Sequence, residues 1–543
     1  MKLKNLLLKY KFEIIIFLIA LMFSWWLMFS SFSYKQGFME ISSKSWSDFA
    51  SHIPLIRSFS LGNNFPPQYP LFSGPIIRYH FLFFALVGLL EKSGLRIDLA
   101  LNIPSILGFS FLILMIYIFA KGFFKSKVVG ILSIIFFLFN GSLEFIQLFS
   151  KNLPLKDIFT SVITSNKFLA FGPYDNNIVS AFWNLNIYTN QRHLALSFGS
   201  AILIIYLFSV KKINLNYKKS LFFGLIIAIM FLLNMAVFLM LDVVLFFIFL
   251  LIYKERKYLF FILLSSSLFS LPFYLLERSR DSISGISIHF GYLVANLNLL
   301  NFINYWIQNF GLHLLLITGA FILCDKEKRR FLLSVFFLFI IGNLFQFSPE
   351  VAANHKFFNF FMIFGVMYSA YFIYFLWKRS LLIRPFLVII IFFLIFSGLI
   401  DFFPIFNDYK IPLADYPANK DILWIIKNTK PDSVFLNSNY LYTNSTLAGR
   451  KNFLGWPYFA WSQGYDTTDR DILRKKLFDT NDKLFFCGQT LKNKIDYIEY
   501  DNNLGNSDKI MLSNLINSNK NLIYKSKDGE YKIYSVSKIC KNK

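Results

Sequence analysis

Long apolar runs alternate with short polar segments along the chain as far as residue 403. A run of about 17–22 apolar residues can cross a hydrocarbon layer of roughly 30 Å as an α-helix. The first run, 12–30, follows a basic segment and lacks a small-residue cleavage site, so we interpret it as a retained span and not as a signal peptide. The pattern predicts a mostly α-helical, polytopic transmembrane bundle.

Short loops rich in Lys and Arg separate the runs, at 121–127, 211–219, 254–257, 326–330 and 378–384. Basic loops of this kind face the cytoplasm. Placing all of them there gives a cytoplasmic N-terminus, an extracytoplasmic C-terminus and eleven spans. The predicted spans are 12–30, 99–120, 128–149, 195–210, 220–235, 237–253, 259–276, 309–324, 331–347, 357–377 and 383–403.

Two stretches do not fit a simple crossing. As one helix, 220–253 would be about 50 Å long at 1.5 Å per residue, so we interpret it as two spans joined by a tight hairpin near Asn234. The apolar stretch 79–90 is short, and counting it as a crossing would place several basic loops outside. We therefore interpret it as a partly inserted or surface helix.

Composition supports a membrane protein and excludes a nucleic-acid partner. The chain of 543 residues is 56% hydrophobic with a mean hydropathy of +0.51, which is too apolar for a soluble protein of this size. A net charge of +24 would suit nucleic acid, but the basic residues follow the positive-inside pattern instead. We expect a multi-pass protein of the plasma membrane, in contact with membrane lipids.

The composition changes after residue 403, where the chain becomes polar with mixed charge. We divide it into a membrane domain at 1–403, with an outer loop at 31–98, and a small extracytoplasmic α/β domain at 404–543. The elements predicted in the second domain are a helix at 421–428, strands at 433–436 and 495–500, and a hairpin at 521–537 that turns at Asp528-Gly529.

Cysteine is rare, with three residues in the chain, so neither a disulfide framework nor a zinc cluster is indicated. Cys487 and Cys540 both lie in the predicted extracytoplasmic domain. We hypothesise that they form a disulfide if that compartment is oxidising.

Polar chemistry gathers in the outer loop at 45–80. Asp48 and His52 are four residues apart and would share one face of a helix, which a Pro/Gly-rich turn at 63–75 then ends. In the predicted topology all six histidines lie in outer loops or at the outer end of a span. One explanation is that the cytoplasmic loops are short and rich in lysine. The other is that polar groups converge on a cavity at the outer face, since ionisable residues beside a membrane are usually functional.

This set of groups suits a substrate with a phosphate head and a lipid tail. A carboxylate can take a proton from an acceptor hydroxyl while cations stabilise the departing phosphate, which Arg grips well. A capping or headgroup-anchoring role is the structural alternative for each residue. The predicted catalytic residue is Asp48, and the predicted substrate-binding residues are His52, Arg57, Arg78, His80, Gln191, Arg192, His193, His355 and Lys356.

Three blocks of sequence carry a family resemblance. WSDFASH at 46–52, the turn that follows and RYHFLFFALVGLLEKSGL at 78–95 resemble the first outer loop of GT-C-type membrane glycosyltransferases, a group similar to the protein mannosyltransferases and the aminoarabinose transferases of lipid A. LALNIPSILGFSFLILMIYIFAKGFF at 99–124 resembles their second-span region. GRKNFLGWPYFAWSQGY at 449–465 resembles a block of a poorly characterised multi-spanning subgroup.

The resemblance implies a GT-C-like fold and transfer of a sugar from a polyprenyl-phosphate donor to a hydroxyl of a glycan, lipid or protein, with inversion. It implies that Asp48 is catalytic and that Arg192, His193 and Lys356 bind the donor phosphate. Many members carry two neighbouring acids, whereas the nearest acid to Asp48 here is Glu40. A divalent cation, Mg or Mn, held by Asp48 and His52 is therefore left open.

Two other functions are compatible with the sequence. A transporter or flippase of lipid-linked sugars predicts broken helices, internal repeats and charges at the midplane of the membrane, and we find no convincing repeat between the halves. A non-catalytic assembly protein of the cell envelope would use the extracytoplasmic domain as its working part, and its polar loops would tolerate alanine.

Overall fold

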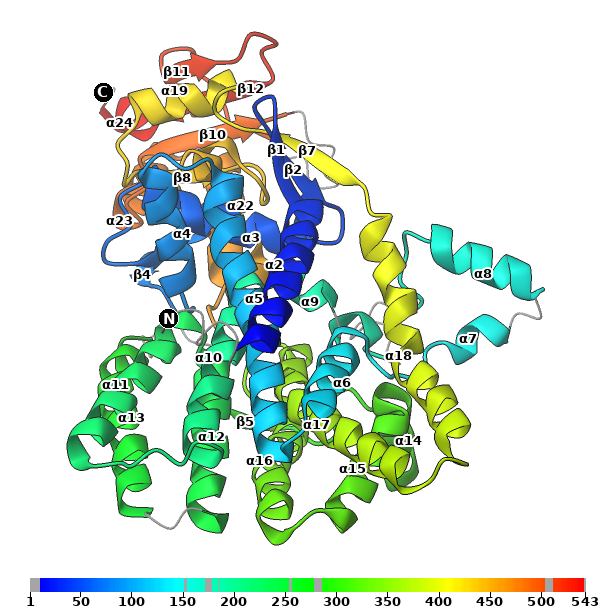
Figure 1. The fold of residues 1–543 in the computed structure, drawn as a ribbon. Coiled ribbons are helices and arrows are strands. Elements are labelled where there is room, and N and C mark those ends of the chain that lie inside the picture. The colour runs from blue at the N-terminus through cyan, green and yellow to red at the C-terminus, as the bar shows by residue number, and fades with distance from the viewer. Residues whose placement is uncertain are drawn as a thin grey trace, which may run out of the picture.

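The computed structural model describes residues 10–150, 154–170, 178–183, 185–252, 256–277, 286–502 and 511–541. Two residues of the predicted basic loop at 254–257 lie outside these ranges. The described chain is mostly helical, with a helical bundle at the bottom of Figure 1 and a smaller layer with most of the strands at the top.

Polar side chains start several helices of the bundle. Ser126, Asn216 and Asp325 each accept a hydrogen bond from the backbone N–H three residues further on, at the start of α6, α11 and α16. The long helices are α2 (Lys11–Ser31), α5 (Ile97–Phe124), α6 (Lys127–Leu138), α10 (Arg192–Ser209), α11 (Tyr217–Leu233), α12 (Met235–Leu251), α13 (Arg256–Glu277), α14 (Leu299–Phe310), α15 (Leu312–Leu323), α16 (Lys326–Leu344), α17 (His355–Arg379) and α18 (Arg384–Phe406).

Six helices of the described chain are long and apolar enough to cross a membrane, or seven if the bent pair α14–α15 is one span. The predicted number of eleven is too high. α6 has 12 residues and α12 has 17, and α16 begins with a run of charged residues. An apolar run does not fix the length of the helix that forms within it, which is why the sequence pattern overcounts. The candidate spans are Lys11–Ser31, Ile97–Phe124, Arg192–Ser209, Arg256–Leu275, Val351–Arg379 and Arg384–Phe406.

The predicted span at 309–324 is broken. α14 and α15 meet at Gly311 with a bend of 94°. Gly311 has a φ of +53°, and a Cβ at this position would lie 2.0 Å from the carbonyl oxygen of Gly141. Both the backbone conformation and the close approach require glycine, and together they fix the bend.

The predicted break at Asn234 is confirmed. α11 ends just before this residue, α12 begins just after it, and the two helices also pack against each other. The side chain of Asn234 caps α12 by accepting a hydrogen bond from the backbone N–H of Val237 at 3.1 Å. The stretch predicted to be a surface or partly inserted helix forms α4 (Leu82–Lys92), whose 11 residues are too few to cross a membrane and pack on α5 and on the helix at 46–60.

The second layer is built on two sheets. β1, β2 and β7 form an antiparallel sheet in which β2 is central. The other sheet has the order β11-β12-β10-β8-β9 and is mixed, because β8 runs parallel to β10 and β9. The strands are β1 (Phe32–Lys35), β2 (Phe38–Ser42), β3 (Gln68–Tyr69), β4 (Phe72–Ile76), β5 (Ser287–Ile288), β6 (Phe345–Gln346), β7 (Lys410–Ala414), β8 (Val434–Asn437), β9 (Lys451–Asn452), β10 (Tyr497–Asp501), β11 (Leu522–Lys525) and β12 (Tyr531–Ser535).

Shorter helices connect these elements or cover the sheets. α3 contains Pro54 and buries most of its residues, and it lies between the sheets and the bundle in Figure 1. The shorter helices are α3 (Trp46–Ser60), α7 (Ile146–Phe149), α8 (Leu155–Thr164), α9 (Leu185–Asn190), α19 (Lys420–Asn428), α20 (Asn444–Leu447), α21 (Pro457–Ser462), α22 (Thr468–Asp479), α23 (Lys483–Lys492) and α24 (Val536–Lys541), with 3₁₀ turns at Ser180–Phe182 and Val351–Asn354.

One apolar core joins the first outer loop to the C-terminal region. It contains Phe49 and Ile56 of α3 together with Phe435 of β8 and Ile498 of β10, all fully buried. β7 pairs with β2 of the outer loop, so the C-terminal region also completes a sheet begun near the N-terminus. The two regions assigned to separate domains, on either side of residue 403, therefore share their packing.

The elements predicted after residue 403 are confirmed. α19, β8 and β10 lie within a residue or two of the predicted ranges, and β11 and β12 form the predicted hairpin around Asp528-Gly529. Cys487 and Cys540 form a disulfide, as hypothesised. Polar and apolar residues alternate clearly here, which is why the pattern was easier to interpret than in the bundle.

Candidate active site

A hydrogen bond from Ser45, the residue just before α3, fixes the position of the start of this helix. The Ser45 side chain donates a hydrogen bond to the Asn190 amide oxygen at 2.6 Å. Asn190 ends α9, and α10 begins two residues later. This contact therefore joins the start of α3, where Asp48 lies in the first turn, to the start of α10, which carries His193.

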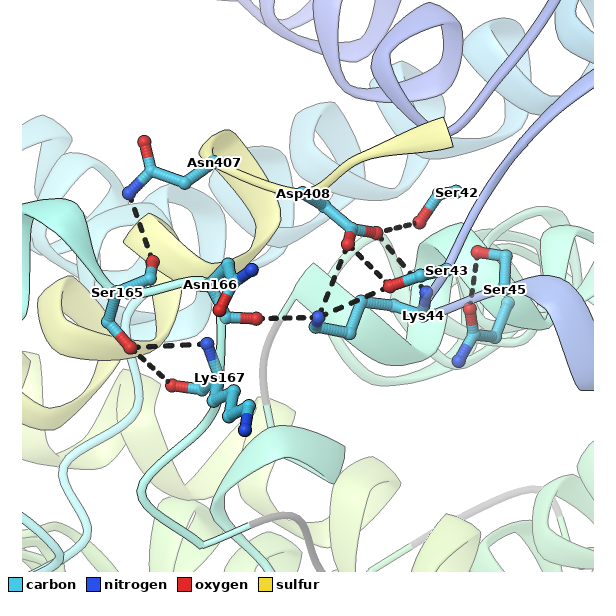
Figure 2. A network of polar contacts seen from close by, with 10 residues as sticks. Ser42, Ser43, Lys44, Ser45, Ser165, Asn166, Lys167, Asn407 and Asp408 are labelled. Atoms are coloured by element: carbon cyan, nitrogen blue, oxygen red, sulfur yellow. Dashed lines mark hydrogen bonds and ion pairs between the residues drawn. The ribbon is translucent and has the colours of Figure 1, made fainter. Parts of the chain in front are cut away.

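A polar network holds the loop before α3 (Figure 2). Asp408, just after α18, accepts hydrogen bonds from the hydroxyls of Ser42 and Ser43 and from the backbone N–H of Lys44. The Lys44 ammonium lies 3.2 Å from the Asp408 carboxylate and donates a hydrogen bond to the carbonyl oxygen of Asn166 at 2.6 Å. The end of the last span thus anchors the residues that lead into α3.

Three histidines from separate segments meet beside α3. The Nε2 atoms of His80 and His193 are 2.7 Å apart, so one ring donates a hydrogen bond to the other. The His52 ring lies edge-on to His193, with 6.0 Å between the ring centres. All three are buried, and within the described residues the Nδ1 atoms of His52 and His193 have no hydrogen-bond partner.

Asp48 lies in the field of a nearby cation. Burial raises the pKa of its carboxyl to about 6, the positive charge of Lys356 on α17 opposes that rise, and the negative charge of Glu350 adds to it. No ion pair joins Asp48 to Lys356 in the part of the chain that the structure describes. The carboxylate and the ammonium group are therefore close enough to influence each other's charge without forming an ion pair.

The histidines are neutral at pH 7. Burial lowers the pKa of His52 to about 3, with further contributions from the charges of Arg192 and Lys356. Burial, Lys356 and His52 lower the pKa of His80 well below its usual value. Each neutral imidazole offers one hydrogen-bond donor and one acceptor to a bound hydroxyl or phosphate oxygen. We refer to Asp48, His52, His80, His193 and Lys356 as the Asp48 cluster.

Aromatic rings exclude water from the cluster. The Tyr79 ring lies tilted against His80 with 3.7 Å between the ring centres, and the Phe84 ring centre lies 4.7 Å from that of His52. The Tyr442 hydroxyl donates a hydrogen bond to the Trp46 carbonyl oxygen, which covers the first turn of α3. These contacts are the physical cause of the burial that shifts the pKa values of the cluster.

The C-terminal block at 449–465 holds the first outer loop in place. Gly449 approaches α3 so closely that a Cβ would lie 2.5 Å from the Arg57 carbonyl oxygen, and its φ of +78° also favours glycine. Asn452 and Gly455 donate backbone hydrogen bonds to the carbonyl oxygens of Pro70 and Leu71 at 2.8 Å. Two of the three sequence blocks that carry the family resemblance, the first outer loop and 449–465, are thus in direct contact.

The same block reaches the loop that carries Glu350. The Ser348 hydroxyl donates a hydrogen bond to the Ser462 carbonyl oxygen at 2.9 Å. The sequence analysis selected His355 and Lys356 from this segment but not Glu350, whose negative charge raises the pKa of the Asp48 carboxyl. Its signal was its place in SPEVAANHK, six residues before Lys356.

Arg57 is not part of the cluster. Its guanidinium forms ion pairs with Asp415 at 2.7 Å and with Glu91 at 3.2 Å, and the residue is fully buried. A guanidinium already held by two carboxylates is not available to bind a phosphate. These ion pairs indicate a structural role for Arg57, and its predicted role in substrate binding stays a prediction. Asp415 lies 358 residues away in the chain, so the local sequence pattern did not reveal this pair.

Arg78 joins the outer loop to the C-terminal block. Its guanidinium donates a hydrogen bond to the Gly464 carbonyl oxygen at 2.8 Å and lies over the Tyr465 ring, whose hydroxyl accepts from the Arg78 backbone N–H. These contacts give Arg78 a role in holding two segments together. They do not direct its charge at the Asp48 cluster.

Arg192 is saturated by groups from other helices. Its guanidinium donates to the carbonyl oxygens of Thr189 and Met28. It also donates to the Ser31 hydroxyl at 2.8 Å and to the Asn102 amide oxygen at 3.3 Å. The side chain therefore ties α10 to α2 and α5, and of the predicted pair at 192–193 only the histidine enters the cluster.

Gln191 and His355 lie beside cluster residues in the sequence but make other contacts. The Gln191 backbone N–H donates to Ile187, and its side-chain oxygen is buried without a hydrogen-bond partner among the described residues. The His355 ring contacts the edge of Phe182, and its Nδ1 lies 3.3 Å from the Asn359 amide nitrogen. Neither contact tests a role in substrate binding.

The cluster does not form a metal site as it stands. Among the described residues no group of three or more His, Cys, Asp or Glu side chains is placed to hold a metal ion. The Lys356 ammonium beside Asp48 also disfavours a second cation there. The residues around Asp48 therefore do not fit the Mg or Mn ion considered from the sequence.

An internal cavity of about 40 Å³ lies elsewhere in the bundle. It lies between α6, α14, α15 and α17, and its lining includes Trp183, His313 and Asn359. Asp48, Lys356 and the three clustered histidines are not among its lining residues. The polar groups and this cavity are therefore separate features.

No protein-family model matches the chain, and neither does any curated protein. Among solved structures, the chain is similar to the archaeal oligosaccharyltransferase AglB from Archaeoglobus fulgidus in complex with an inhibitory peptide and a dolichol-phosphate. The TM-score is 0.47 at 12% identity, over 91% of this chain and 70% of that chain.

Two other structures of the Archaeoglobus fulgidus oligosaccharyltransferase are similar, also at 12% identity. One is tethered to an acceptor peptide (TM-score 0.47, 92% of this chain and 70% of that one), and the other is a complex with Zn and sulfate (TM-score 0.45, 90% and 68%). At 12% identity, only the residues of the site can indicate what this chain does.

Proposed function

We propose that this integral membrane protein is a glycosyltransferase that moves a sugar from a polyprenyl-phosphate donor to an acceptor hydroxyl at the outer face of the membrane. The observation that carries the proposal is the Asp48 cluster. A half-buried carboxylate with a raised pKa, a nearby ammonium group that is not paired with it and three buried imidazoles come together from four segments of the chain.

The groups of the cluster match the needs of sugar transfer from a phosphate carrier. The Asp48 carboxylate takes the proton from the acceptor hydroxyl, and the acceptor oxygen attacks the anomeric carbon of the sugar. The bond between that carbon and the phosphate oxygen breaks, and the electron pair leaves with the polyprenyl phosphate. Lys356 stabilises the negative charge on the departing phosphate, and the imidazoles donate hydrogen bonds to it or to sugar hydroxyls.

The outer location is supported by the disulfide and by the loop charges. The pair Cys487–Cys540 is expected to persist in an oxidising compartment. The region that contains it shares a core with α3, so the disulfide and Asp48 lie on the same side of the membrane. In the topology predicted from the sequence, short basic loops such as 211–219 and 326–330 face the cytoplasm.

The test compares Asp48→Asn with Asp469→Asn, an exposed acid of α22. Purified protein is given a panel of polyprenyl-phosphate hexoses and pentoses with membrane extract as the source of acceptors. Release of polyprenyl phosphate is followed by mass spectrometry. We expect the Asp48 variant to lose a factor of about 10²–10⁴ in turnover, the usual contribution of a general base. Wild-type turnover in this variant would overturn the assignment.

A flippase of lipid-linked sugars is the second candidate, and the bend between α14 and α15 favours it, because transporters often use broken helices. The two functions are separated by the fate of the donor. A flippase moves the intact lipid-linked sugar across vesicles that contain only the purified protein, whereas the proposed enzyme breaks the sugar–phosphate bond and requires an acceptor.

A further inference from the structure

α8 projects sideways from the body of the molecule beside the upper part of α18 (Figure 1). Its residues Leu155, Phe159 and Ile163 recur every four positions and form one ridge along the helix. Their side chains are 73%, 68% and 37% exposed. An apolar ridge of this kind is costly in water, so the described part of the chain leaves one face of α8 without its natural surroundings.

The neighbouring edge of the same apolar face is covered by protein. Ile158 is 7% exposed and packs with Ile400 of α18, and Val162 packs against the same group. The apolar arc of α8 is therefore wider than the surface that α18 covers. Packing on α18 accounts for one edge of the arc, and the ridge at 155, 159 and 163 needs a second apolar contact.

A hydrogen bond fixes the level of α8 relative to the membrane. Asn407 follows the last residue of α18, a candidate span. Its side-chain amide donates to the carbonyl oxygen of Ile163 at 2.6 Å. It also donates to the carbonyl oxygen of Ser165 at 3.0 Å, a contact that Figure 2 shows. The C-terminal end of α8 is thus held where α18 leaves the hydrocarbon layer.

The surface next to α8 is also apolar. Phe406, the last residue of α18, is 58% exposed at the end of the helix that contacts α8. Phe386, Ile389 and Phe392, towards the other end of α18, are 68%, 53% and 45% exposed, as expected for a helix that faces lipid along its length. Ile146 and Phe149 of the preceding helix α7 are 53% and 47% exposed. The ridge of α8 therefore continues a surface that the membrane itself covers, which favours lipid over a protein partner.

The polar side chains of α8 are suited to the same surroundings. The hydroxyls of Thr160, Ser161 and Thr164 each donate to a carbonyl oxygen one turn earlier in the same helix, so they need few bonds to water. Lys156 and Asp157 are exposed; Asp157 lies opposite the ridge, and Lys156 flanks it beside Ile163, where its long side chain can reach the headgroups. Charged residues there can contact lipid headgroups.

We infer that α8 is an interfacial helix that lies in the plane of the membrane surface, with Leu155, Phe159 and Ile163 inserted among the lipid acyl chains. A helix with one apolar and one charged face binds a membrane in this orientation. It anchors the segment between α6 and α9 at the membrane, on the side where α18 ends.

The test measures the depth of single residues by spin labelling. The free cysteine Cys324 is first replaced by alanine, and the disulfide is kept. Labels are then placed by Phe159→Cys on the ridge and, as the matched control, by Thr160→Cys on the adjoining polar face. The full chain is reconstituted into phosphatidylcholine and phosphatidylglycerol vesicles, and label accessibility to oxygen and to a water-soluble nickel chelate is measured by power saturation.

We expect the ratio of oxygen to nickel accessibility to be several-fold higher at position 159 than at 160. Leu155→Cys should give the same result as Phe159→Cys, which guards against an effect of one label on its surroundings. Equal access of nickel to both positions would overturn the inference, because α8 would then lie in water. Exclusion of both reagents from position 159 would also overturn it, because the ridge would be covered by protein.

Discussion

The two ends of α3 carry charge in opposite ways. Arg57, near the C-terminal end, is locked between the carboxylates of Asp415 and Glu91. Asp48, in the first turn, senses Lys356 but forms no ion pair with it among the described contacts. On one helix, Arg57 is paired with two carboxylates and stabilises the fold. Asp48 has no ion-pair partner among the described residues, and we assign it to the proposed reaction. Each prediction below tests this contrast, from the largest expected effect to the smallest.

Loss of Arg57 should damage the fold. Arg57→Ala leaves two buried carboxylates without their partner, which typically costs about 3–5 kcal/mol. The expected result is a marked fall in the unfolding temperature of the protein in detergent. Arg96→Ala is the matched control, because the Arg96 side chain is 51% exposed and its pairing with Asp98 should contribute no more than about 1 kcal/mol. Equal effects of the two variants would contradict the structural role of Arg57.

Loss of Lys356 should damage function and leave the fold intact. Lys356→Met keeps the length of the side chain and removes the charge that we assign to the departing phosphate. Removing one such stabilising group usually lowers turnover by about 10²–10³. The assay is release of polyprenyl phosphate, and Lys378→Met at the other end of the same helix serves as the control. A large loss of stability with unchanged turnover would reverse the contrast with Arg57.

Removing the charge of Asp48 should stabilise the protein at alkaline pH. The pKa of Asp48 is raised to about 6 in the folded protein from 3.8, so its ionisation costs folding energy that appears as pH rises through this interval. We expect Asp48→Asn to be more stable than the wild type by about 1–2 kcal/mol at pH 8, after allowance for partial exposure. The two proteins should be equally stable near pH 3.5, where the carboxyl is protonated in both states. Thermal unfolding at the two pH values measures the difference.

Turnover should depend on the ionisation of Asp48. A base must be deprotonated to act, so turnover should fall about tenfold for each unit of pH below 6 and level off above it. Neutral histidines add no further step above pH 6, because burial lowers the pKa values of His52 and His80. A rate profile that rose towards acid pH would contradict the role of Asp48 as a base.

Removal of divalent metal ions by a chelator should have the smallest effect on turnover. The described residues place no set of three metal-binding side chains together, and Lys356 supplies positive charge beside Asp48. We therefore expect turnover to be unchanged by EDTA to within about a factor of two, since cationic side chains can stabilise a departing phosphate by themselves. A loss that Mg or Mn restores would show that a metal completes the site.

Local pattern predicted one half of this contrast better than the other. The four-residue spacing of Asp48 and His52 placed both in α3 with its acid in the first turn, as the structure confirms. The partner of Arg57, however, lies 358 residues away, and nothing in the neighbouring sequence signals it. The sequence around an arginine looks the same whether its guanidinium pairs with a carboxylate of the protein or binds a phosphate of a substrate. The ion pairs give Arg57 a structural role, and the substrate-binding role predicted for it from the sequence stays untested.

The spans show a similar limit. Apolar runs and basic loops correctly indicated a membrane bundle, but they do not reveal where a helix stops within a run, as at α6 and α12. The bend at Gly311 depends on the carbonyl oxygen of Gly141, a contact between distant segments. By contrast the hairpin of β11 and β12 depends on a turn and on alternation within 17 residues, and sequence pattern was sufficient to find it.

The core that joins α3 to β8 and β10 sets an order of events during synthesis. When the last residue of α18 has just been translated, Asp48 and every histidine of the cluster have been made, but Asp415 and Phe435 have not. Until they arrive, Arg57 has an incomplete set of counter-ions and the apolar face of α3 has no cover. The Asp48 cluster is therefore held by its full set of contacts only when nearly the whole chain has been made, so an unfinished chain lacks the complete site that we propose for sugar transfer.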